Sequence, residues 1–512
     1  MKPIRLMSGF FTVGGWTLLS RVLGFVREVM ILSLIGPGPL MDAFVAAFRL
    51  PNMFRRFFAE GAFNAAFVPM FSKRLEGGEH PEAFARDALS GLFFVVLLLT
   101  GLGMIFMPAL VWATAEGFSG DERFDLTVGF GRIVFPYILF MSLSALFSGI
   151  LNATGRFAVA AAAPVLLNIF VISALVIANV TGGPAILWLV WAIPVAGIAQ
   201  LTLTWRAVSA AGFSLRPKMP RWNRQMRDLV VIALPAAMAS GVMQINLVVG
   251  QLVASQYDKA VSWLFAADRL YQLPLGVVGI AVGIVLLPDL SRRLRAGDDS
   301  GAQTALSRAA EVSLALTIPS AVALVVIPLT LVSVLFQRGA ASVDDSAAIA
   351  TAVMIYGLGL PAFVLQKILQ PVYFAREDTR RPFYFALAAM VVNAGLAVGL
   401  APIVGWLAPA IAATLAGWAM FAMLAIGARR YGDAVRFDAR FHKRIWRILL
   451  ASAIMGAVLW FFNVQLNTLL ALAWWRSFGL LILLLLGAVA YFGSGQMLGA
   501  FQLSEFRRAL RR

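Results

Sequence analysis

Apolar windows long enough to cross a lipid bilayer recur fourteen times along this chain of 512 residues. A membrane-spanning helix needs about 20 mainly apolar residues, because its backbone polar groups must all be satisfied within the helix. Composition agrees, since 61% of the residues are hydrophobic and only 13% are charged. The sequence therefore predicts an all-α polytopic membrane protein with fourteen transmembrane helices. The predicted spans begin near Ser8, Asp42, Phe84, Phe124, Phe157, Pro184, Met226, Val261, Ala305, Ala347, Pro382, Gly405, Ile445 and Leu469.

The positions of the lysines and arginines predict the orientation of these helices. Of the 42 Lys and Arg residues, 30 lie in the two termini and in the connections from an even-numbered to an odd-numbered span. Basic loops stay on the cytoplasmic side of a membrane, so both termini are predicted to be cytoplasmic. The net charge of +17 then reflects topology, and no nucleic-acid partner is predicted. The odd-to-even connections hold only Arg123, Lys259, Arg338 and Arg476.

Several kinds of chemistry lack the residues that they need. The chain has no cysteine, and its two histidines, His80 and His442, lie in polar connections. Disulfides, thiolate nucleophiles, cysteine metal sites and histidine-based catalysis are thereby disfavoured, so no catalytic residue, metal site or cofactor is predicted. The N-terminal segment Met1–Met7 is short and basic, without a small-residue cleavage site. We therefore expect the first apolar window to remain as a span.

Two parts of the chain, about 220 residues apart, repeat short motifs in the same order. The offset covers six spans, an even number, so the two halves are predicted to be parallel repeats with a central cavity between them. We predict an N-terminal lobe of spans 1–6 (residues 1–215) and a C-terminal lobe of spans 7–12 (residues 216–432). Spans 13 and 14 (residues 433–512) fall outside the repeat. The matching pairs are AAFRL (Ala46–Leu50) with AADRL (Ala266–Leu270), PMFSKRL (Pro69–Leu75) with PDLSRRL (Pro288–Leu294), and Thr154, Arg156 and Asn168 with Thr379, Arg381 and Asn393.

Charged residues inside the predicted spans point to a functional cavity. Such residues are costly at membrane depth and usually face a watery cavity or a partner. Six arginines against four acids leave a surplus of two positive charges, which suits a phosphate or pyrophosphate because guanidinium offers paired donors. The arginines are Arg21, Arg27, Arg49, Arg55, Arg56 and Arg269, and the acids are Glu28, Asp42, Glu60 and Asp268.

Other polar positions have structural interpretations. Asn168 and Asn393 are predicted to bridge helices by hydrogen bonds rather than to bind a ligand. Trp474 and Trp475 with Arg476 are typical of an anchor at the membrane interface. For any single arginine in a span, an ion pair between helices or snorkelling to the interface is an equally good explanation.

Several motifs together resemble the MurJ/MviN lipid II flippase family of the multidrug/oligosaccharidyl-lipid/polysaccharide exporter superfamily. The resemblance extends over the whole chain, and the first two spans are its most specific part. The motifs are SRVLGFVRE (Ser20–Glu28), DAFVAAFRLPNMFRRFFAEGAFNAAFVP (Asp42–Pro69), FPYILF (Phe135–Phe140), ADRLYQLP (Ala267–Pro274) and GIAVGIVLLPDLS (Gly279–Ser291).

The resemblance implies a transporter, not an enzyme, of the bacterial inner membrane. It implies transfer of an undecaprenyl-pyrophosphate-linked glycopeptide, lipid II, from the cytoplasmic to the periplasmic leaflet by alternating access. Spans 13 and 14 would form a groove for the lipid tail. Membrane lipids are further partners, the protein would act as a monomer, and association with cell-wall synthesis machinery is left open. Residues matching the family's substrate-binding positions are Arg21, Arg27, Arg55 and Arg269, with Arg49, Ser20, Asp42 and Glu60 in support.

Two departures from the family pattern leave the energy source open. Gln272 stands where some members carry a glutamate, and the segment Leu229–Ser255 contains no acidic residue for a sodium site. Coupling to membrane potential or to a cation is therefore not assigned. The alternative functions are a flippase for another polyprenyl-linked glycan and a related drug/cation antiporter. The antiporter predicts an acidic cavity, which the surplus of arginines disfavours.

Overall fold

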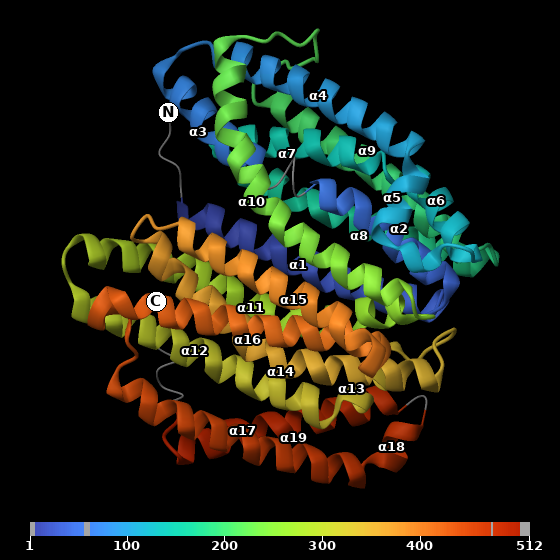
Figure 1. Cartoon of the computed structure of the whole chain (residues 1–512), viewed down its shortest axis with the longest axis vertical. Coiled ribbons are helices and arrows are strands. Elements are labelled where there is room, and N and C mark those ends of the chain that lie inside the picture. Colours follow the sequence, from blue (N-terminus) through green and yellow to red (C-terminus); the bar gives the residue numbers. More distant parts are fainter. Residues whose placement is uncertain (1–5, 56–61, 473–474, 502–512) are drawn as a thin grey trace. The chain divides into compact units, whose positions relative to one another are not determined.

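The computed structural model describes residues 6–55, 62–472 and 475–501, and within these ranges its regular elements are all helices (Figure 1). Nine helical runs among the described residues are long and apolar enough to cross a membrane. The predicted all-α membrane architecture is thereby confirmed, while the count of fourteen spans stays a prediction.

The chain folds into two compact units, Met1–Ser262 and Trp263–Arg512. The first unit includes the helix that begins the predicted C-terminal lobe, so the units and the repeat divide the chain at different points. The predicted lobes remain an inference from sequence. The helices of the first unit are α1 (Leu6–Leu34), α2 (Pro39–Arg55), α3 (Ala62–Gly77), α4 (Pro81–Ile105), α5 (Met107–Thr114), η2 (Glu116–Phe118), α6 (Glu122–Val134), α7 (Tyr137–Ala153), α8 (Phe157–Thr181), α9 (Ala185–Ala210) and α10 (Arg224–Ser255).

The next helix, α11, crosses the boundary between the units, and the remaining helices belong to the second unit. They are α11 (Ala260–Arg295), α12 (Asp299–Val326), α13 (Pro328–Phe336), α14 (Val343–Phe374), α15 (Arg380–Val404), η3 (Gly405–Leu407), α16 (Ala408–Ala428), η4 (Arg429–Val435), α17 (Ala439–Gln465), α18 (Asn467–Ala471) and α19 (Arg476–Met497).

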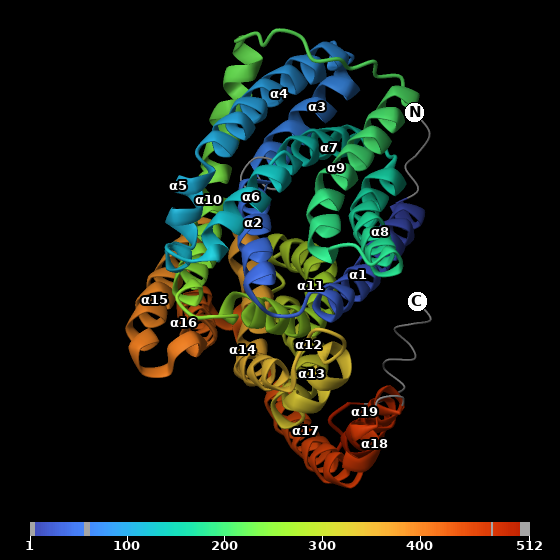
Figure 2. The ribbon, with the colours of Figure 1, turned by 90° about the vertical axis from the view of Figure 1, so that its right-hand side faces the viewer.

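In the first unit, α8 packs against both α1 and α9, and α7 packs against α9 (Figure 2). Helix α2 lies against α6 and α7. An aromatic core anchors α3 to α4, where the Phe67 ring stacks on the rings of Phe71 and Phe84 with centroids 5.5 and 5.6 Å apart. This packing positions α1 and α2, which carry most of the predicted site.

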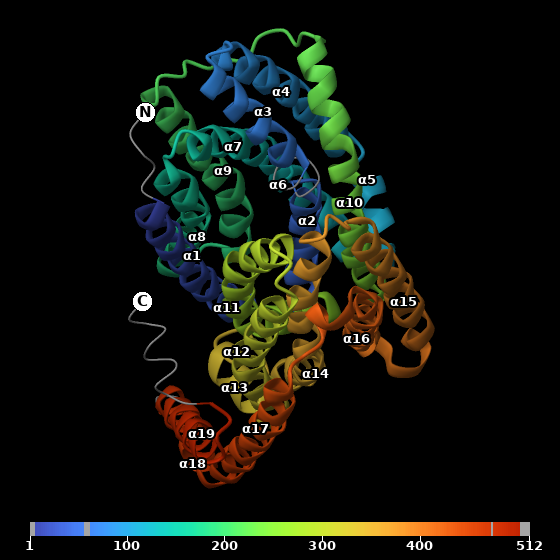
Figure 3. The same ribbon diagram turned by 90° about the vertical axis from the view of Figure 1, so that its left-hand side faces the viewer.

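In the second unit, α14 packs against α12 and α16, and α15 pairs with α16. Helix α17 lies on α12 and pairs with α19, so the two helices outside the repeat are docked onto the unit (Figure 3). The Tyr491 hydroxyl of α19 donates a hydrogen bond of 2.5 Å to the Ala315 carbonyl of α12. Spans 13 and 14 therefore have a defined place against α12.

Short polar motifs determine where many of these helices begin. Asn223 caps α10 by accepting a hydrogen bond from the Met226 amide, and Ser342 forms a capping box at the start of α14. The Gly301 amide donates to Asp298 and holds the pKa of that carboxyl below its usual range, since the bond favours the charged form. Such caps satisfy amides that have no partner within a helix.

Corresponding breaks occur in the two units. Helix α4 ends before Met107 and Pro108, and α12 ends before Pro328, so each long helix is followed by a short one, α5 or α13. Proline lacks an amide hydrogen and disfavours helical backbone in the residue before it. Helices α8 and α15, which begin at the matched Thr-x-Arg motifs, each contain 25 residues.

Candidate functional site

Arg27 is held in a polar cluster between α1 and α8, formed by Ser20, Arg27, Glu28 and Asn168 and called the α1–α8 cluster below. Arg27 Nη1 donates to Asn168 Oδ1 at 2.9 Å, and Arg27 Nη2 pairs with Glu28 Oε1 at 2.5 Å. Asn168 Nδ2 donates to the Ser20 carbonyl at 2.9 Å. Only 13% of the Arg27 side chain is exposed. The guanidinium is therefore oriented from two sides rather than free to rotate.

The structure brings together two of the predicted site residues in this cluster, Ser20 and Arg27. The predicted role of Asn168 as a bridge between helices is confirmed by its bonds to α1. Arg21 lies on the same helix with an exposed side chain. Arg49 and Arg55 are half-buried along α2. Two further candidates, Arg56 and Glu60, lie outside the described residues.

Asp42 is the centre of a second cluster, called the Arg123 network and formed by Asp42, Asp121, Arg123, Asp258 and Ser262. The Asp42 carboxylate accepts hydrogen bonds from the Ser262 amide, at 2.8 Å, and from the Ser262 hydroxyl. Its other oxygen lies 3.7 Å from Arg123 Nη1. Asp42 is fully buried. These contacts join the start of α2 to the start of α11.

Arg123 extends this network to the neighbouring segments. Its guanidinium pairs with Asp121 at 2.5 Å and with Asp258 at 3.3 Å, and it donates to the Tyr257 carbonyl at 3.3 Å. A close backbone approach lies beside it, because a Cβ on Gly117 would stand 2.5 Å from the Gln256 nitrogen. The beginnings of α2 and α6 are thereby tied to the α10–α11 connection.

Arg269 belongs to the second unit, on α11. Its guanidinium lies over the Phe265 ring, 4.6 Å from the centroid, in a cation–π contact. On the same helix the Gln272 amide donates to the Asp268 carboxylate. Arg269 is half-buried.

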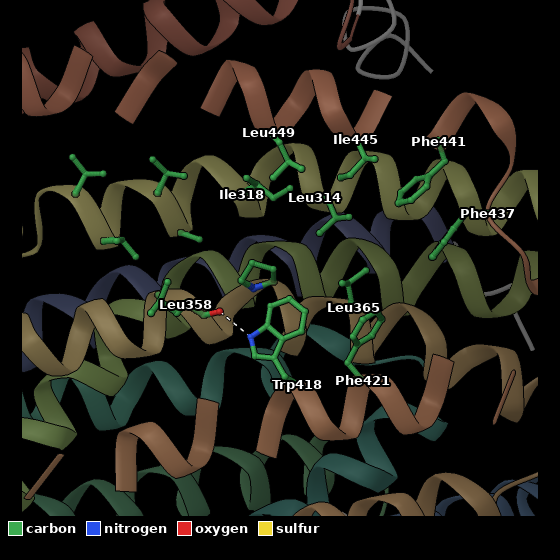
Figure 4. Close-up of a pocket in the computed structure, with 16 residues that line it drawn as sticks. Leu314, Ile318, Leu358, Leu365, Trp418, Phe421, Phe437, Phe441, Ile445 and Leu449 are labelled. Atoms are coloured by element: carbon green, nitrogen blue, oxygen red, sulfur yellow. Dashed lines mark hydrogen bonds between the residues drawn. The ribbon is translucent and has the colours of Figure 1, made fainter. Parts of the chain in front are cut away.

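The second unit also contains an apolar pocket of about 550 Å³ between α12, α14, α16 and α17 (Figure 4). That volume lies within the usual range of roughly 300–1,000 Å³ for small-ligand sites. The Trp418 indole nitrogen donates to the Leu358 carbonyl at 3.1 Å, so its one polar group is satisfied. Helix α17, the predicted span 13, lines the pocket, whereas α19 contributes no lining residue. Lining residues include Leu314, Ile318, Leu358, Leu365, Trp418, Phe421, Phe437, Phe441, Ile445 and Leu449.

Ion pairs hold α17 at one end of this pocket. Glu311 on α12 is buried and pairs with Arg308, with Arg444 at 3.3 Å and with Arg440 at 3.6 Å. Arg308 also pairs with Asp438, which caps α17 through the Phe441 amide at 2.7 Å. A buried carboxylate needs such partners to offset its desolvation. The position of α17 on α12 is thus specified by charge as well as by apolar contact.

Sequence reasoning did not assign Arg123 and Ser262 to any site. Arg123 was distinguishable only as one of the four basic residues in the odd-to-even connections, and Ser262 carries no sequence signal. In the described part of the chain, no group of three or more histidine or acidic side chains is placed to hold a metal ion.

Comparisons with known proteins agree on one family. A family model described as lipid II flippase MurJ matches residues 31–484. A probable lipid II flippase MurJ from Rhizobium tropici is 42% identical, and the alignment covers 99% of this chain and 97% of the relative. A solved structure of lipid II flippase MurJ in an inward closed conformation matches with a TM-score of 0.80 and 25% identity, over 98% of this chain and 99% of the other. An inward-facing multidrug resistance MATE family transporter shares the fold, with a TM-score of 0.68 and 15% identity over 83% of this chain and 98% of the other.

Proposed function

The chain belongs to the lipid II flippase MurJ family, and from that premise we propose that it moves lipid II from the cytoplasmic to the periplasmic leaflet of the bacterial inner membrane. The family consists of multi-pass membrane transporters rather than enzymes. Lipid II is a peptidoglycan precursor whose glycopeptide is joined to a polyprenyl tail through pyrophosphate. The transported headgroup therefore carries negative charge, and the tail is entirely apolar.

The observation that carries this proposal is the fixed orientation of Arg27 in the α1–α8 cluster. A guanidinium that is oriented in advance loses less freedom when it binds pyrophosphate, and each terminal nitrogen has a second N–H besides the one donated to Asn168 or Glu28. Arg21, Arg55 and Arg269 supply further positive charge, supported by Arg49, Ser20 and Glu60. Asp42 acts as a positioning residue, because its contacts hold the starts of α2 and α11 together.

The polyprenyl tail has a matching apolar site. We assign it to the pocket between α12, α14, α16 and α17, since every lining residue is apolar. Apolar side chains offer dispersion contacts along an apolar chain, so a long tail binds there without polar contacts. Span 13, which lies outside the repeat, would then bind the tail as part of this pocket.

Transport proceeds by alternating access in this proposal. The cytoplasmically open cavity binds the headgroup, the lobes rock, and the cavity opens to the periplasm while the tail stays in the apolar pocket beside α17. Pairing the pyrophosphate with arginines lowers the cost of taking its charge through a low-dielectric region. Membrane potential biases the empty carrier, because one charge moved across 100 mV is worth about 2.3 kcal/mol.

Labelling of lipid II at the outer leaflet tests the function directly. In cells depleted of their own lipid II flippase, outer-leaflet labelling should fall, and expression of this chain should restore it. Dissipating the membrane potential should then reduce the restored labelling. An unchanged low level of labelling despite membrane-inserted protein would contradict the proposed function.

Two neighbouring leucines of α17 allow a matched test of the tail site. Leu449 lines the pocket and is 39% exposed, whereas Leu450 does not line it and is 51% exposed. Leu449→Trp should fill part of the pocket and weaken binding of a long-chain polyprenyl pyrophosphate by about tenfold, since overfilled apolar sites cost about 1–3 kcal/mol. Leu450→Trp should leave binding unchanged.

The measurement is the affinity of each purified, full-length variant for a long-chain and for a short-chain polyprenyl pyrophosphate. The Leu449→Trp variant should lose affinity for the long chain only, because the short chain does not reach the pocket. Equal affinities of both variants for the long chain would show that the tail does not bind in this pocket.

A further inference from the structure

Arg338 and Arg476 meet at the end of the second unit where α13 finishes and α19 begins. Arg338 lies two residues after the end of α13, and its Nη2 donates to the Ser477 hydroxyl of α19 at 3.1 Å. Arg476 is the first residue of α19, next to Ser477. The Arg338 guanidinium therefore lies against the first turn of α19, one residue along the chain from Arg476. Two arginines distant in sequence are thus brought to the same helix start.

Neither arginine has an acidic partner among the residues that the structure describes. The remaining bonds of Arg338 go from Nε and Nη2 to the Val334 carbonyl, at 3.3 and 3.1 Å. Arg476 also stands in the first turn of a helix, where the partial positive charge of the helix end disfavours a cation. The pair is therefore electrostatically unfavourable unless an anion joins it.

Topology does not explain this pair. Arg338 and Arg476 are two of the four basic residues in the odd-to-even connections, the side where the positive-inside pattern excludes them. An anchor at the interface would need only one of them. Two arginines at one helix start without a carboxylate partner are instead suited to a phosphate, because guanidinium groups offer paired donors to it.

The surroundings fit the phosphate of a lipid. Trp475 is 53% exposed and packs on Phe478 with ring centroids 6.0 Å apart, which is typical of residues at headgroup depth. Farther along α19, Leu481 and Leu485 are exposed on one face, four residues apart. The α13–α19 contact itself is fixed by packing of the two helices (Figure 3).

We propose that Arg338 and Arg476 form a binding site for the phosphate group of a membrane lipid, whose chains lie along the exposed face of α19. The site belongs to the membrane side opposite the basic connections. Either a phospholipid or a polyprenyl pyrophosphate carries the required chemistry. The site does not depend on which substrate the central cavity transports.

A site-specific probe is available because the chain contains no cysteine. A fluorophore on Leu481→Cys, in the full-length protein reconstituted in phosphatidylcholine bilayers, reports lipids beside α19. Brominated phosphatidylglycerol should quench it more strongly than brominated phosphatidylcholine at equal content. The variant R338A/R476A should lose this preference, with apparent affinity falling on the order of tenfold or more.

Matched variants separate binding from damage to the fold. R338K/R476K should keep part of the preference, since charge remains while the planar fork is lost. Arg132→Ala is the control, because Arg132 is an exposed single arginine whose Nε donates to the Met104 carbonyl. The fluorescence of this control should be quenched by the two brominated lipids to the same extents as in the parent protein. An identical preference in the parent and in R338A/R476A would overturn the proposal.

Competition identifies the source of the phosphate. Added farnesyl pyrophosphate should relieve the excess quenching if the site takes polyprenyl pyrophosphate, and should leave it unchanged if the site takes phospholipid. Both results support a lipid-phosphate site. Rescue of a flippase-depleted strain by R338A/R476A, measured in parallel, shows separately whether transport depends on the site.

Discussion

Arg27→Ala should abolish rescue of a strain depleted of its own lipid II flippase, although the variant still accumulates in the membrane. Arg27 is the arginine whose orientation the α1–α8 cluster fixes, through Glu28 and Asn168. Removing a desolvated charge from a binding site costs about 2–5 kcal/mol, which is roughly 30-fold or more in dissociation constant. Growth on depletion and the amount of protein in membranes are the two measurements.

Companion variants distinguish charge from geometry at this position. Arg27→Lys keeps a cation without the fork and should rescue poorly. Asn168→Leu keeps the guanidinium but removes its hydrogen-bond partner, so binding should weaken by about tenfold rather than disappear. Arg132→Ala should rescue fully. Arg269→Ala should fail as Arg27→Ala does, because Arg269 is another arginine of the proposed pyrophosphate site.

Rescue at the parental level by both Arg27→Ala and Arg269→Ala would contradict the proposal that these arginines bind the pyrophosphate. Loss of rescue accompanied by loss of the protein from membranes would instead indicate a folding defect, since Glu28 is buried beside Arg27. The variant Arg27→Ala/Glu28→Ala resolves that case. It removes the buried acid together with its partner, so the protein should return to the membrane without rescue.

The sequence predicted the fold class and singled out the charges of α1 because both rest on local patterns. Apolar windows and the cost of charge in a membrane are readable residue by residue. The partner of Arg27 was less accessible, because Asn168 lies 141 residues away and only the folded helices bring them together. Its match with Asn393 in the repeat was the one available signal.

The environment of Asp42 was even harder to predict from the sequence than the partner of Arg27. In the sequence it is an acid near the start of a span, which suits a cavity residue. In the structure it accepts hydrogen bonds from Ser262, 220 residues away, and is fully buried. Nothing in the sequence around Asp42 or around Ser262 indicates this pairing. Every helix start has backbone amides without a partner in the helix, so an amide such as that of Ser262 is not distinctive in the sequence.

The Arg123 network should make a large contribution to stability, which Arg123→Met tests. Methionine keeps much of the side-chain volume but leaves the buried Asp42 carboxylate without its cation. Breaking a buried pair costs about 3–5 kcal/mol, and we expect the lower end because Asp42 keeps its bonds to Ser262. Asp258 adds little, since its side chain is 93% exposed.

The thermal midpoint of the purified, full-length protein measures this effect, followed by the fluorescence of its 13 tryptophans. Arg123→Met should lower the midpoint by several degrees, whereas the control Arg132→Met should leave it unchanged, because Arg132 is exposed. Adding Asp42→Asn to Arg123→Met should recover part of the loss. The amide oxygen of asparagine still accepts from Ser262, and no uncompensated charge remains. Equal midpoints for Arg123→Met and Arg132→Met would show that the network positions these helix ends without stabilising them.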